Sequence, residues 1–367
     1  MSAITLPQVL SAAAYAVGYR SDDPRDDWAR DAAAVGLPPV RRAVVVLIDG
    51  MGYHQLDARR GHIPFLRRRL DRSARTVFPS TTACAITSLA TGRSPGETGM
   101  VGYTVRDPHS GQRVQMLHFN NGELSVEHWQ VEAPITERVD HGGGICSVGP
   151  RKFSGTGLTL AAWRGIREVF AEHFSARVDS TIAELNRGTR LVYLYWSDLD
   201  HTGHHYGWQS EAWTSEIEHV DANLAELARR LPADTALIIT ADHGMVDVHA
   251  RSDIREVTLP GLEMTAGEGR LLQFFFTDDD AAGHAQERLA QWADGRAVIL
   301  SRAEQEARMG PVSDHVRARL GNFAVAALGD WGVFDSQWAT PGQLSMVGEH
   351  GSITPEECDI PLILDVS

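Results

Sequence analysis

The fold class follows from residues 43–50, which read AVVVLIDG. The run before Asp49 is short, continuously apolar and rich in β-branched side chains, which is typical of a strand buried on both faces of a sheet. Similar runs predict further strands at residues 191–196, 236–240, 271–276, 297–300 and 359–364. Apolar residues at spacings of three and four predict helices over residues 210–230 and 281–292. Strands that alternate with helices predict an α/β sandwich around a largely parallel sheet.

Two regions depart from this alternation. Residues 105–185 are rich in Gly, His and polar residues, and we expect them to form an insertion or cap over one edge of the sheet. Residues 261–340 are expected to contribute a second, smaller patch of strands and helices. We interpret residues 1–367 as a single domain, because large α/β folds often exceed the usual length of ~150 residues through insertions.

The composition is that of an ordinary globular protein, with 43% hydrophobic and 22% charged residues. The formal net charge of −14 argues against a nucleic acid polymer as partner, since phosphate backbones attract basic surfaces. The three cysteines include no CxxC pair, which argues against a disulfide framework. The N-terminal residues lack a basic segment before an apolar stretch, and no run of about 18 apolar residues occurs. We therefore expect a cytoplasmic protein without a membrane partner.

Six Asp and His residues lie next to predicted strands. They are Asp49, Asp200, His204, Asp242, His243 and His350. In an open α/β sheet, ligands bind outside the carboxyl ends of the strands. One such residue would be an ordinary turn or surface residue, but carboxylates and imidazoles gathered at one edge suit zinc and related divalent ions. Six ligands could hold two metals, an arrangement that favours displacement at phosphorus.

A candidate nucleophile lies in residues 78–84, which read FPSTTAC. Residues 85–90 have helical character and are followed by Gly92, a typical C-terminal stop. Thr81 or Thr82 therefore lies at a helix N-terminus, where the helix dipole and free N–H groups favour an alkoxide or a bound phosphate. Alternatively, both threonines serve only as helix caps. These residues by themselves leave the choice open.

Taken in order, these motifs resemble the alkaline phosphatase superfamily, and most of all its nucleotide pyrophosphatase/phosphodiesterase branch and the bacterial relatives of that branch. Residues 49–50 resemble its first metal aspartate and residues 78–82 its nucleophile segment. DHTGHHYG at residues 200–207 is similar to a highly specific signature, and DHGM at 242–245 and HG at 350–351 look like the later motifs. The resemblance implies a three-layer αβα sandwich with a cap, and it selects Thr82 over Thr81 as the nucleophile.

The resemblance also implies a ligand set and a reaction. One metal would be held by Asp200, His204 and His350, and the other by Asp49, Asp242 and His243 together with the Thr82 oxygen. Zinc is the expected metal, while the ligand types also allow manganese or iron. The implied reaction is hydrolysis of a small-molecule phosphate ester through a phospho-threonine intermediate.

One motif departs from the pattern of the family. Phosphodiesterases of this branch commonly carry an Asn that contacts a phosphate oxygen, whereas residues 98–103 read TGMVGY and put Tyr103 there. The phenol could donate a similar hydrogen bond or only line the pocket. A phosphomonoesterase on the same scaffold is therefore the alternative to a phosphodiesterase or nucleotide pyrophosphatase, with a non-catalytic relative as a third reading. Arg93 and Arg106 are either further phosphate contacts or ordinary surface residues.

Overall fold

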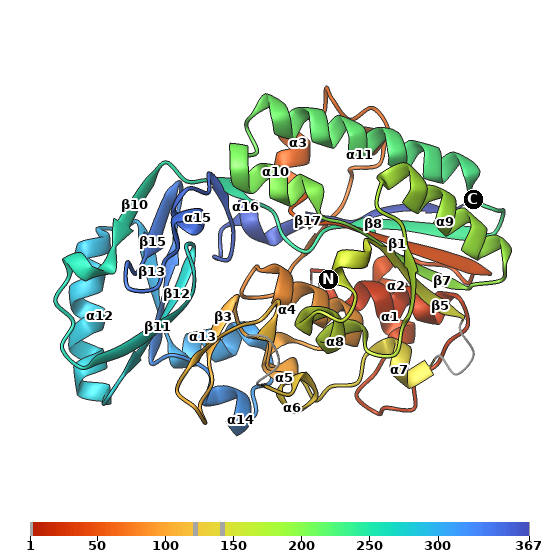
Figure 1. Ribbon diagram of the computed structural model, residues 1–367. Coiled ribbons are helices and arrows are strands. Elements are labelled where there is room, and N and C mark those ends of the chain that lie inside the picture. Colours follow the sequence, from red (N-terminus) through yellow and green to blue (C-terminus); the bar gives the residue numbers. More distant parts are fainter. Residues whose placement is uncertain (1–2, 120–123, 140–143, 367) are drawn as a thin grey trace.

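A six-stranded central sheet organises the protein, whose computed structural model describes residues 3–119, 124–139 and 144–366 (Figure 1). In spatial order its strands are β18 (Ile363–Val366), β8 (Thr235–Thr240), β1 (Arg42–Ile48), β7 (Leu191–Trp196), β5 (Ile145–Gly149) and β6 (Arg167–Phe170). All neighbouring pairs run parallel except the edge pair of β18 with β8. The largely parallel sheet predicted from the sequence is confirmed.

Strand β1 lies inside the sheet because it is apolar on both faces. Its residues from Ala43 to Ile48 are fully buried. The strand pairs in register with β7 on one side and with β8 on the other. The carboxyl ends of these three parallel strands therefore meet at one edge of the sheet, where Asp49 follows β1 and Asp242 lies two residues after β8.

Helices cover both faces of the central sheet, which confirms the three-layer αβα arrangement (Figure 1). One layer contains α9 (Phe174–Asn186), α10 (Asp198–Tyr206) and α11 (Glu211–Arg230). The other contains α1 (Pro7–Ala16), α2 (Trp28–Val35), α4 (Thr82–Thr91) and α8 (Gly157–Trp163). Helix α11 buries Trp213, Ile217 and Leu224, residues of the apolar face that predicted it.

A second sheet of four antiparallel strands lies beside the first (Figure 1). In spatial order it contains β11 (Leu262–Glu268), β12 (Leu271–Phe276), β14 (Phe323–Ala327) and β13 (Ala297–Ser301). Helix α12 (Asp279–Ala293) packs Leu289 into a buried cluster with Phe274 and Phe323. The smaller patch expected within residues 261–340 is therefore present.

Shorter elements connect these layers. The helices are α3 (Tyr53–Ala58), α5 (Pro95–Thr98), α6 (Val126–Trp129), α7 (Ile135–Val139), α13 (Arg302–Met309), α14 (Asp314–Arg317), α15 (Pro341–Leu344) and α16 (Pro355–Cys358). The strands are β2 (Ser73–Arg75), β3 (Thr104–Arg106), β4 (Arg113–Gln115), β9 (Val246–Asp247), β10 (Ala250–Asp253), β15 (Trp331–Phe334), β16 (Gly348–Glu349) and β17 (Asp359–Pro361). In the part of the chain that the structure describes, no helix has the length and apolar character needed to cross a membrane.

The expectation that residues 105–185 form an insertion over the sheet is wrong for the second half of that region. Strands β5 and β6 belong to the central sheet, and α9 packs against it. Strand β6 has no apolar run because it lies at the sheet edge, where Arg167 and Phe170 are exposed. The single strand expected at residues 359–364 is also wrong, because β17 pairs with β2 and β18 with β8, on either side of Leu362.

Candidate active site

The seven residues expected to form the site come together at the carboxyl edge of β7, β1 and β8. Five different parts of the fold carry them. Asp49 follows β1, and Asp242 and His243 follow β8. Asp200 and His204 lie on α10, one helical turn apart, so both side chains are on the same face of the helix. His350 follows β16, and Thr82 is the first residue of α4.

Asp200, His204 and His350 form the first ligand group. Nε2 of His204 lies 3.1 Å from Oδ2 of Asp200, and Nε2 of His350 lies 3.9 Å from Oδ1 of the same carboxylate. The candidate ligand atoms of these three residues all lie within 4.8 Å of one another. One metal ion could therefore contact all three side chains after small shifts.

His243 is at the centre of the second group. Its Nε2 atom lies 3.3 Å from Oδ2 of Asp242, 3.4 Å from Oδ1 of Asp49 and 3.1 Å from Oγ1 of Thr82. Asp49 and His243 also lie within ligand distance of Asp200, so Asp200 is near both groups. The rings of His243 and His350 stack with centroids 3.5 Å apart, which joins the two groups into one cluster.

The three imidazoles are oriented in the same way by backbone carbonyl groups. Nδ1 of His204 bonds to the oxygen of Gly348 at 2.7 Å. Nδ1 of His243 bonds to the oxygen of Gly244 and Nδ1 of His350 to that of Ser80, both at 3.0 Å. A carbonyl oxygen only accepts, so each Nδ1 carries a proton, and in the neutral ring Nε2 presents a lone pair to the cluster. This is the tautomer that a metal ligand requires.

The carboxylates of the cluster carry more negative charge than the protein neutralises. Within the described residues, no Lys or Arg nitrogen lies within 4 Å of Asp49, Asp200 or Asp242. One oxygen of each, Asp49 Oδ1, Asp200 Oδ1 and Asp242 Oδ2, is buried without a hydrogen-bond partner. Burial, together with the charges of Asp242 and Asp200, raises the pKa of Asp49 well above its ordinary value. Bound cations would offset this repulsion, so the donor set fits divalent metal ions.

Thr82 lies at an open helix end. The N-cap residue of α4 is Thr81, whose side chain makes no capping hydrogen bond. Its hydroxyl instead donates to Oε2 of Glu268 at 3.2 Å. The first N–H groups of α4 are therefore not capped by Thr81 and remain available to an anion. The alternative that Thr81 and Thr82 serve only as helix caps is therefore not supported: Thr81 makes no capping hydrogen bond, and Thr82 is already inside the helix.

A cavity of about 720 Å³ opens beside the cluster and is lined by Asp49, Thr82, Asp200, His204 and His350. One part of its lining includes Tyr195 of β7, whose ring contacts Phe153, together with Trp163 of α8. Another part comes from the second sheet and nearby segments and includes Tyr103, Arg113, Glu268 and Trp338. Sites for small molecules usually have this size and this mixture of apolar walls with a few polar groups.

Two residues of the site were not identified as site residues from the sequence. Tyr195 lies near the end of β7, and its hydroxyl donates to Oδ2 of Asp49. Glu268 ends β11 of the second sheet, and burial raises the pKa of its carboxyl group well above the ordinary value. The alternation of β7 could have indicated that Tyr195 lies on a sheet face, but no local pattern connects Glu268 with Thr81.

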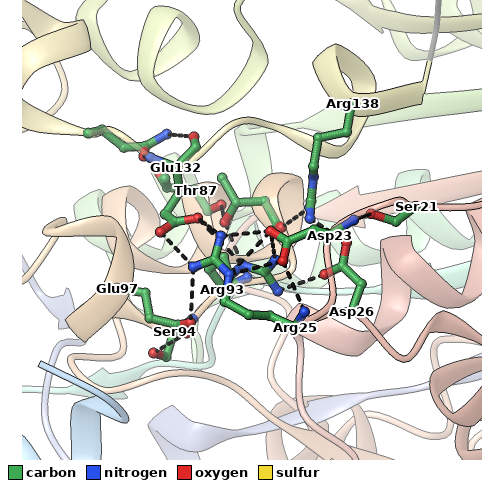
Figure 2. A network of polar contacts seen from close by, with 12 residues as sticks. Ser21, Asp23, Arg25, Asp26, Thr87, Arg93, Ser94, Glu97, Glu132 and Arg138 are labelled. Atoms are coloured by element: carbon green, nitrogen blue, oxygen red, sulfur yellow. Dashed lines mark hydrogen bonds and ion pairs between the residues drawn. The ribbon is translucent and has the colours of Figure 1, made fainter.

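Both arginines considered as phosphate contacts lie outside the cavity. Arg93 is 5% exposed and belongs to a buried ionic network beyond the C-terminal end of α4 (Figure 2). It pairs with Asp26 at 2.7 Å and with Asp23 at 2.8 Å. Arg106 pairs with Glu263 at 3.4 Å. Of the two histidines that flank His204, His201 lines the cavity, and His205 is exposed and packs against the His201 ring.

Comparison with solved structures gives the same fold. Murine ectonucleotide pyrophosphatase / phosphodiesterase 5 is 18% identical, with a TM-score of 0.66 over 89% of this chain and 88% of that one. An inactive variant of the murine protein in complex with AMP gives 19% identity, a TM-score of 0.66, and coverage of 88% and 87%. Phosphonoacetate hydrolase from Sinorhizobium meliloti 1021, in complex with phosphonoformate, is 21% identical with a TM-score of 0.65 over 90% and 91%. Among curated proteins no match was found.

The sequence itself identifies the family. The pattern described as "Type I phosphodiesterase / nucleotide pyrophosphatase" matches residues 43–352, from the second residue of β1 to just beyond His350. The matched region contains all seven clustered residues and most of the chain. The protein therefore belongs to the type I phosphodiesterase / nucleotide pyrophosphatase family, whose members are metal-dependent enzymes that act on phosphate esters.

Proposed function

We propose that the protein is a two-metal phosphodiesterase with Thr82 as its nucleophile. The observation that carries this proposal is the position of the Thr82 hydroxyl, at the open N-terminus of α4 and 3.1 Å from Nε2 of His243. A phosphoryl group at this position would face N–H donors and the positive end of the helix dipole. The neighbouring carboxylates supply the ligands for the cations that phosphoryl transfer needs.

In this proposal, each metal is held by three side chains. Asp200, His204 and His350 hold one ion, and Asp49, Asp242 and His243 hold the other. We propose zinc, because imidazole nitrogens combined with carboxylate oxygens suit it, while manganese and iron are the alternatives for the same donor atoms. Two divalent ions would stabilise the negative charge that develops on the attacking and leaving oxygens.

The residues of the chain supply the covalent chemistry. Oγ1 of Thr82 loses its proton and bonds to phosphorus, while the bond to the leaving oxygen breaks and the leaving group takes up a proton and departs as an alcohol, which gives a phospho-threonine ester. Water then adds its oxygen to phosphorus, the bond to Oγ1 breaks, the threonine hydroxyl is restored with a proton from water, and a phosphate monoester is released. The N–H groups of the first turn of α4 and the phenol of Tyr103, which lines the cavity, would donate to the phosphoryl oxygens.

The cavity supports a small phosphodiester or phosphoanhydride as the substrate. Its volume of about 720 Å³ is larger than a phosphate group requires, and its lining includes residues of both sheets. A substituent on either side of the phosphorus would therefore meet a protein surface. The murine structure with AMP, whose protein is inactivated by replacement of a threonine with alanine, supports both a threonine nucleophile and a nucleotide ester as the natural class of substrate.

We also propose that the protein resides in the cytoplasm. Cys84, Cys146 and Cys358 are free and buried. Reduced, buried thiols are typical of proteins from reducing compartments.

The first experiment compares hydrolysis of bis-p-nitrophenyl phosphate with that of p-nitrophenyl phosphate. Both assays are run with and without EDTA and added zinc, on the wild type, Thr82→Ala and Thr81→Ala. We expect diester preference, loss of activity on chelation, and a loss of at least about 10³-fold in Thr82→Ala. Thr81→Ala should stay within about tenfold of the wild type, because its hydroxyl contacts Glu268 and not the reacting group.

The possible outcomes separate the parts of the proposal. Monoester preference under the same controls would keep the site and move the substrate class to phosphomonoesters. Metal-independent activity, or full activity in Thr82→Ala, would contradict the mechanism. A larger loss of activity in Thr81→Ala than in Thr82→Ala would show that Thr82 is not the nucleophile.

A further inference from the structure

The hairpin formed by β3 and β4 carries Tyr103 at the edge of the cavity. Tyr103 directly precedes β3, and its carbonyl oxygen accepts from the N–H of Met116 at 2.9 Å. Thr104 anchors the hairpin to β11, because its hydroxyl donates to the oxygen of Gly267 at 2.8 Å and accepts from the N–H of Gly267 at 2.7 Å. The position of Tyr103 is therefore fixed relative to the second sheet.

The orientation of the side-chain amide of Gln115, in β4, is determined by its hydrogen bonds. Its Oε1 atom accepts from the backbone N–H of His118 at 3.0 Å. A backbone N–H can only donate, so this contact assigns the oxygen of the amide and leaves its nitrogen on the other side. That nitrogen, Nε2, lies 3.0 Å from the hydroxyl of Tyr103 and donates to it.

The direction of this hydrogen bond determines what the phenol can do. A tyrosine hydroxyl has one hydrogen to donate, and its oxygen accepts. Because the oxygen of Tyr103 already accepts from Gln115, its hydrogen must point to another acceptor. Within residues 3–119, 124–139 and 144–366 we find no acceptor for it, and the Tyr103 side chain lines the cavity.

We propose that Gln115 is a positioning residue, which fixes Tyr103 as a hydrogen-bond donor to a non-reacting oxygen of the bound phosphoryl group. The inference rests on the proposed function and decides between the two roles that the sequence left open for Tyr103. It also explains how a tyrosine serves where phosphodiesterases of this branch commonly have an asparagine. Without Gln115, the hydroxyl could rotate and turn its lone pairs toward the anion, which would repel it.

The test replaces Gln115 with a residue of the same shape and opposite hydrogen-bonding character. In Gln115→Glu, one carboxylate oxygen still accepts from His118, and the oxygen that replaces Nε2 can only accept, so the hydrogen bond with Tyr103 requires the phenol to donate. The phenol then donates away from the cavity. We expect kcat/KM for bis-p-nitrophenyl phosphate to fall about 10²-fold in Gln115→Glu and equally in Tyr103→Phe. The double variant should be no worse than either single variant.

A second variant of Gln115 and a control for the added charge accompany this double-mutant cycle. Gln115→Met removes the donor without adding an acceptor, so its loss should be intermediate, below about tenfold. Gln112→Glu adds the same charge at an exposed position of the hairpin and should keep wild-type kcat/KM. If Gln115→Glu fails to fold, the order of wild type, Gln115→Met and Tyr103→Phe still tests the inference. Binding of inorganic phosphate to the zinc-loaded proteins, measured by calorimetry, should give the same order.

The contrary outcomes are distinct. If Gln115→Glu lowers kcat/KM by the same factor in the Tyr103→Phe background, the added charge acts independently of Tyr103 and the inference is wrong. A Tyr103→Phe variant with wild-type kcat/KM also overturns it. In both cases Thr82→Ala remains inactive, so the proposed function survives. If wild type and Thr82→Ala have equal activity, the proposed function itself fails.

Discussion

Each end of helix α4 lies against a cluster of mostly buried charged side chains, and the two clusters differ in how their charges are balanced. At its C-terminal end, Arg93, Arg25 and Arg138 face Asp23, Asp26, Glu132 and, at 4.0 Å from Arg25, Glu97, so every carboxylate has a cationic partner (Figure 2). At its N-terminal end, Asp49, Asp200 and Asp242 lie beside His204, His243 and His350, and within the described residues no Lys or Arg nitrogen lies within 4 Å of these carboxylates.

This contrast indicates how a candidate metal site can be recognised from the protein atoms alone. A buried charge needs a partner, since an uncompensated one is strongly unfavourable. The C-terminal network finds its partners within the chain and therefore stabilises the fold by itself. The N-terminal cluster leaves one carboxylate oxygen each of Asp49, Asp200 and Asp242 without a partner, and bound cations would supply the missing charge. We expect changes in the C-terminal network to alter stability, and changes in the N-terminal cluster to alter metal content and activity.

The largest effect should come from Asp242→Asn. The amide oxygen can keep the contacts of Oδ1 with the N–H groups of Gly50 and His243, while the charge of Oδ2 is lost. We expect one metal ion fewer per chain by elemental analysis. We also expect kcat to fall about 10³-fold, which corresponds to the several kcal/mol that a metal contributes to the transition state.

Asp221→Asn is the matched control for this prediction. Asp221 is also a buried aspartate, and it accepts from the N–H groups of Phe65 and Leu66 at 3.0 and 2.8 Å, away from the cavity. Its replacement should lower stability and leave the metal content unchanged. Equal metal loss in both variants would mean that the ligand assignment reflects general destabilisation.

The site was more predictable from the sequence than its surroundings. Asp200 and His204 lie one helical turn apart, and Asp242 and His243 are adjacent, so short motifs contain most of the ligand set. Strand β1 is paired on both sides, which brings Asp49 to the same edge. His350 was a candidate because it lies shortly before the last predicted strand, and Thr81 and Thr82 because they lie at a predicted helix N-terminus. Only the choice of Thr82 over Thr81 required the family resemblance.

The unpredicted features depend on contacts between distant segments. Strand β6 gave no periodic signal because an edge strand does not need apolar side chains on both faces. Tyr195 contacts Asp49 across 146 residues of sequence, and Arg93 contacts Asp23 across 70. Such partners follow from the topology, whereas sequence patterns report only local periodicity and burial. The same reason explains why Arg93 could be taken for a phosphate contact.

The second effect in size should come from Arg93→Met. This change removes a cation that is 5% exposed from between Asp26 and Asp23. Breaking a buried ion pair by removing one partner costs about 3 kcal/mol, which we expect as a lower free energy of unfolding in urea. Metal content and kcat of the folded protein should stay at wild-type values, because the network lies at the opposite end of α4 from Thr82.

Arg25→Met tests whether burial causes the large loss of stability expected for Arg93→Met. Arg25 pairs with Asp23 and Glu132 in the same network, but its side chain is 50% exposed. We expect its loss to cost at most about 1 kcal/mol. If the two variants are equally stable, burial does not determine the strength of the network. A loss of metal in Arg93→Met at unchanged stability would contradict the separation of the two clusters.

The smallest effect should come from Gly92→Ala, at the junction between α4 and the network. Gly92 ends the helix with a φ of 65°, where an L side chain is strained, although a new Cβ would find only ordinary contacts. We expect a loss of about 1 kcal/mol in the free energy of unfolding. Gly283→Ala, within α12 and with open space around the new Cβ, is the control and should gain up to about 1 kcal/mol. Both variants should keep wild-type kcat, because neither change reaches Thr82; a fall in kcat confined to Gly92→Ala would show that the end of α4 at the network also positions the nucleophile.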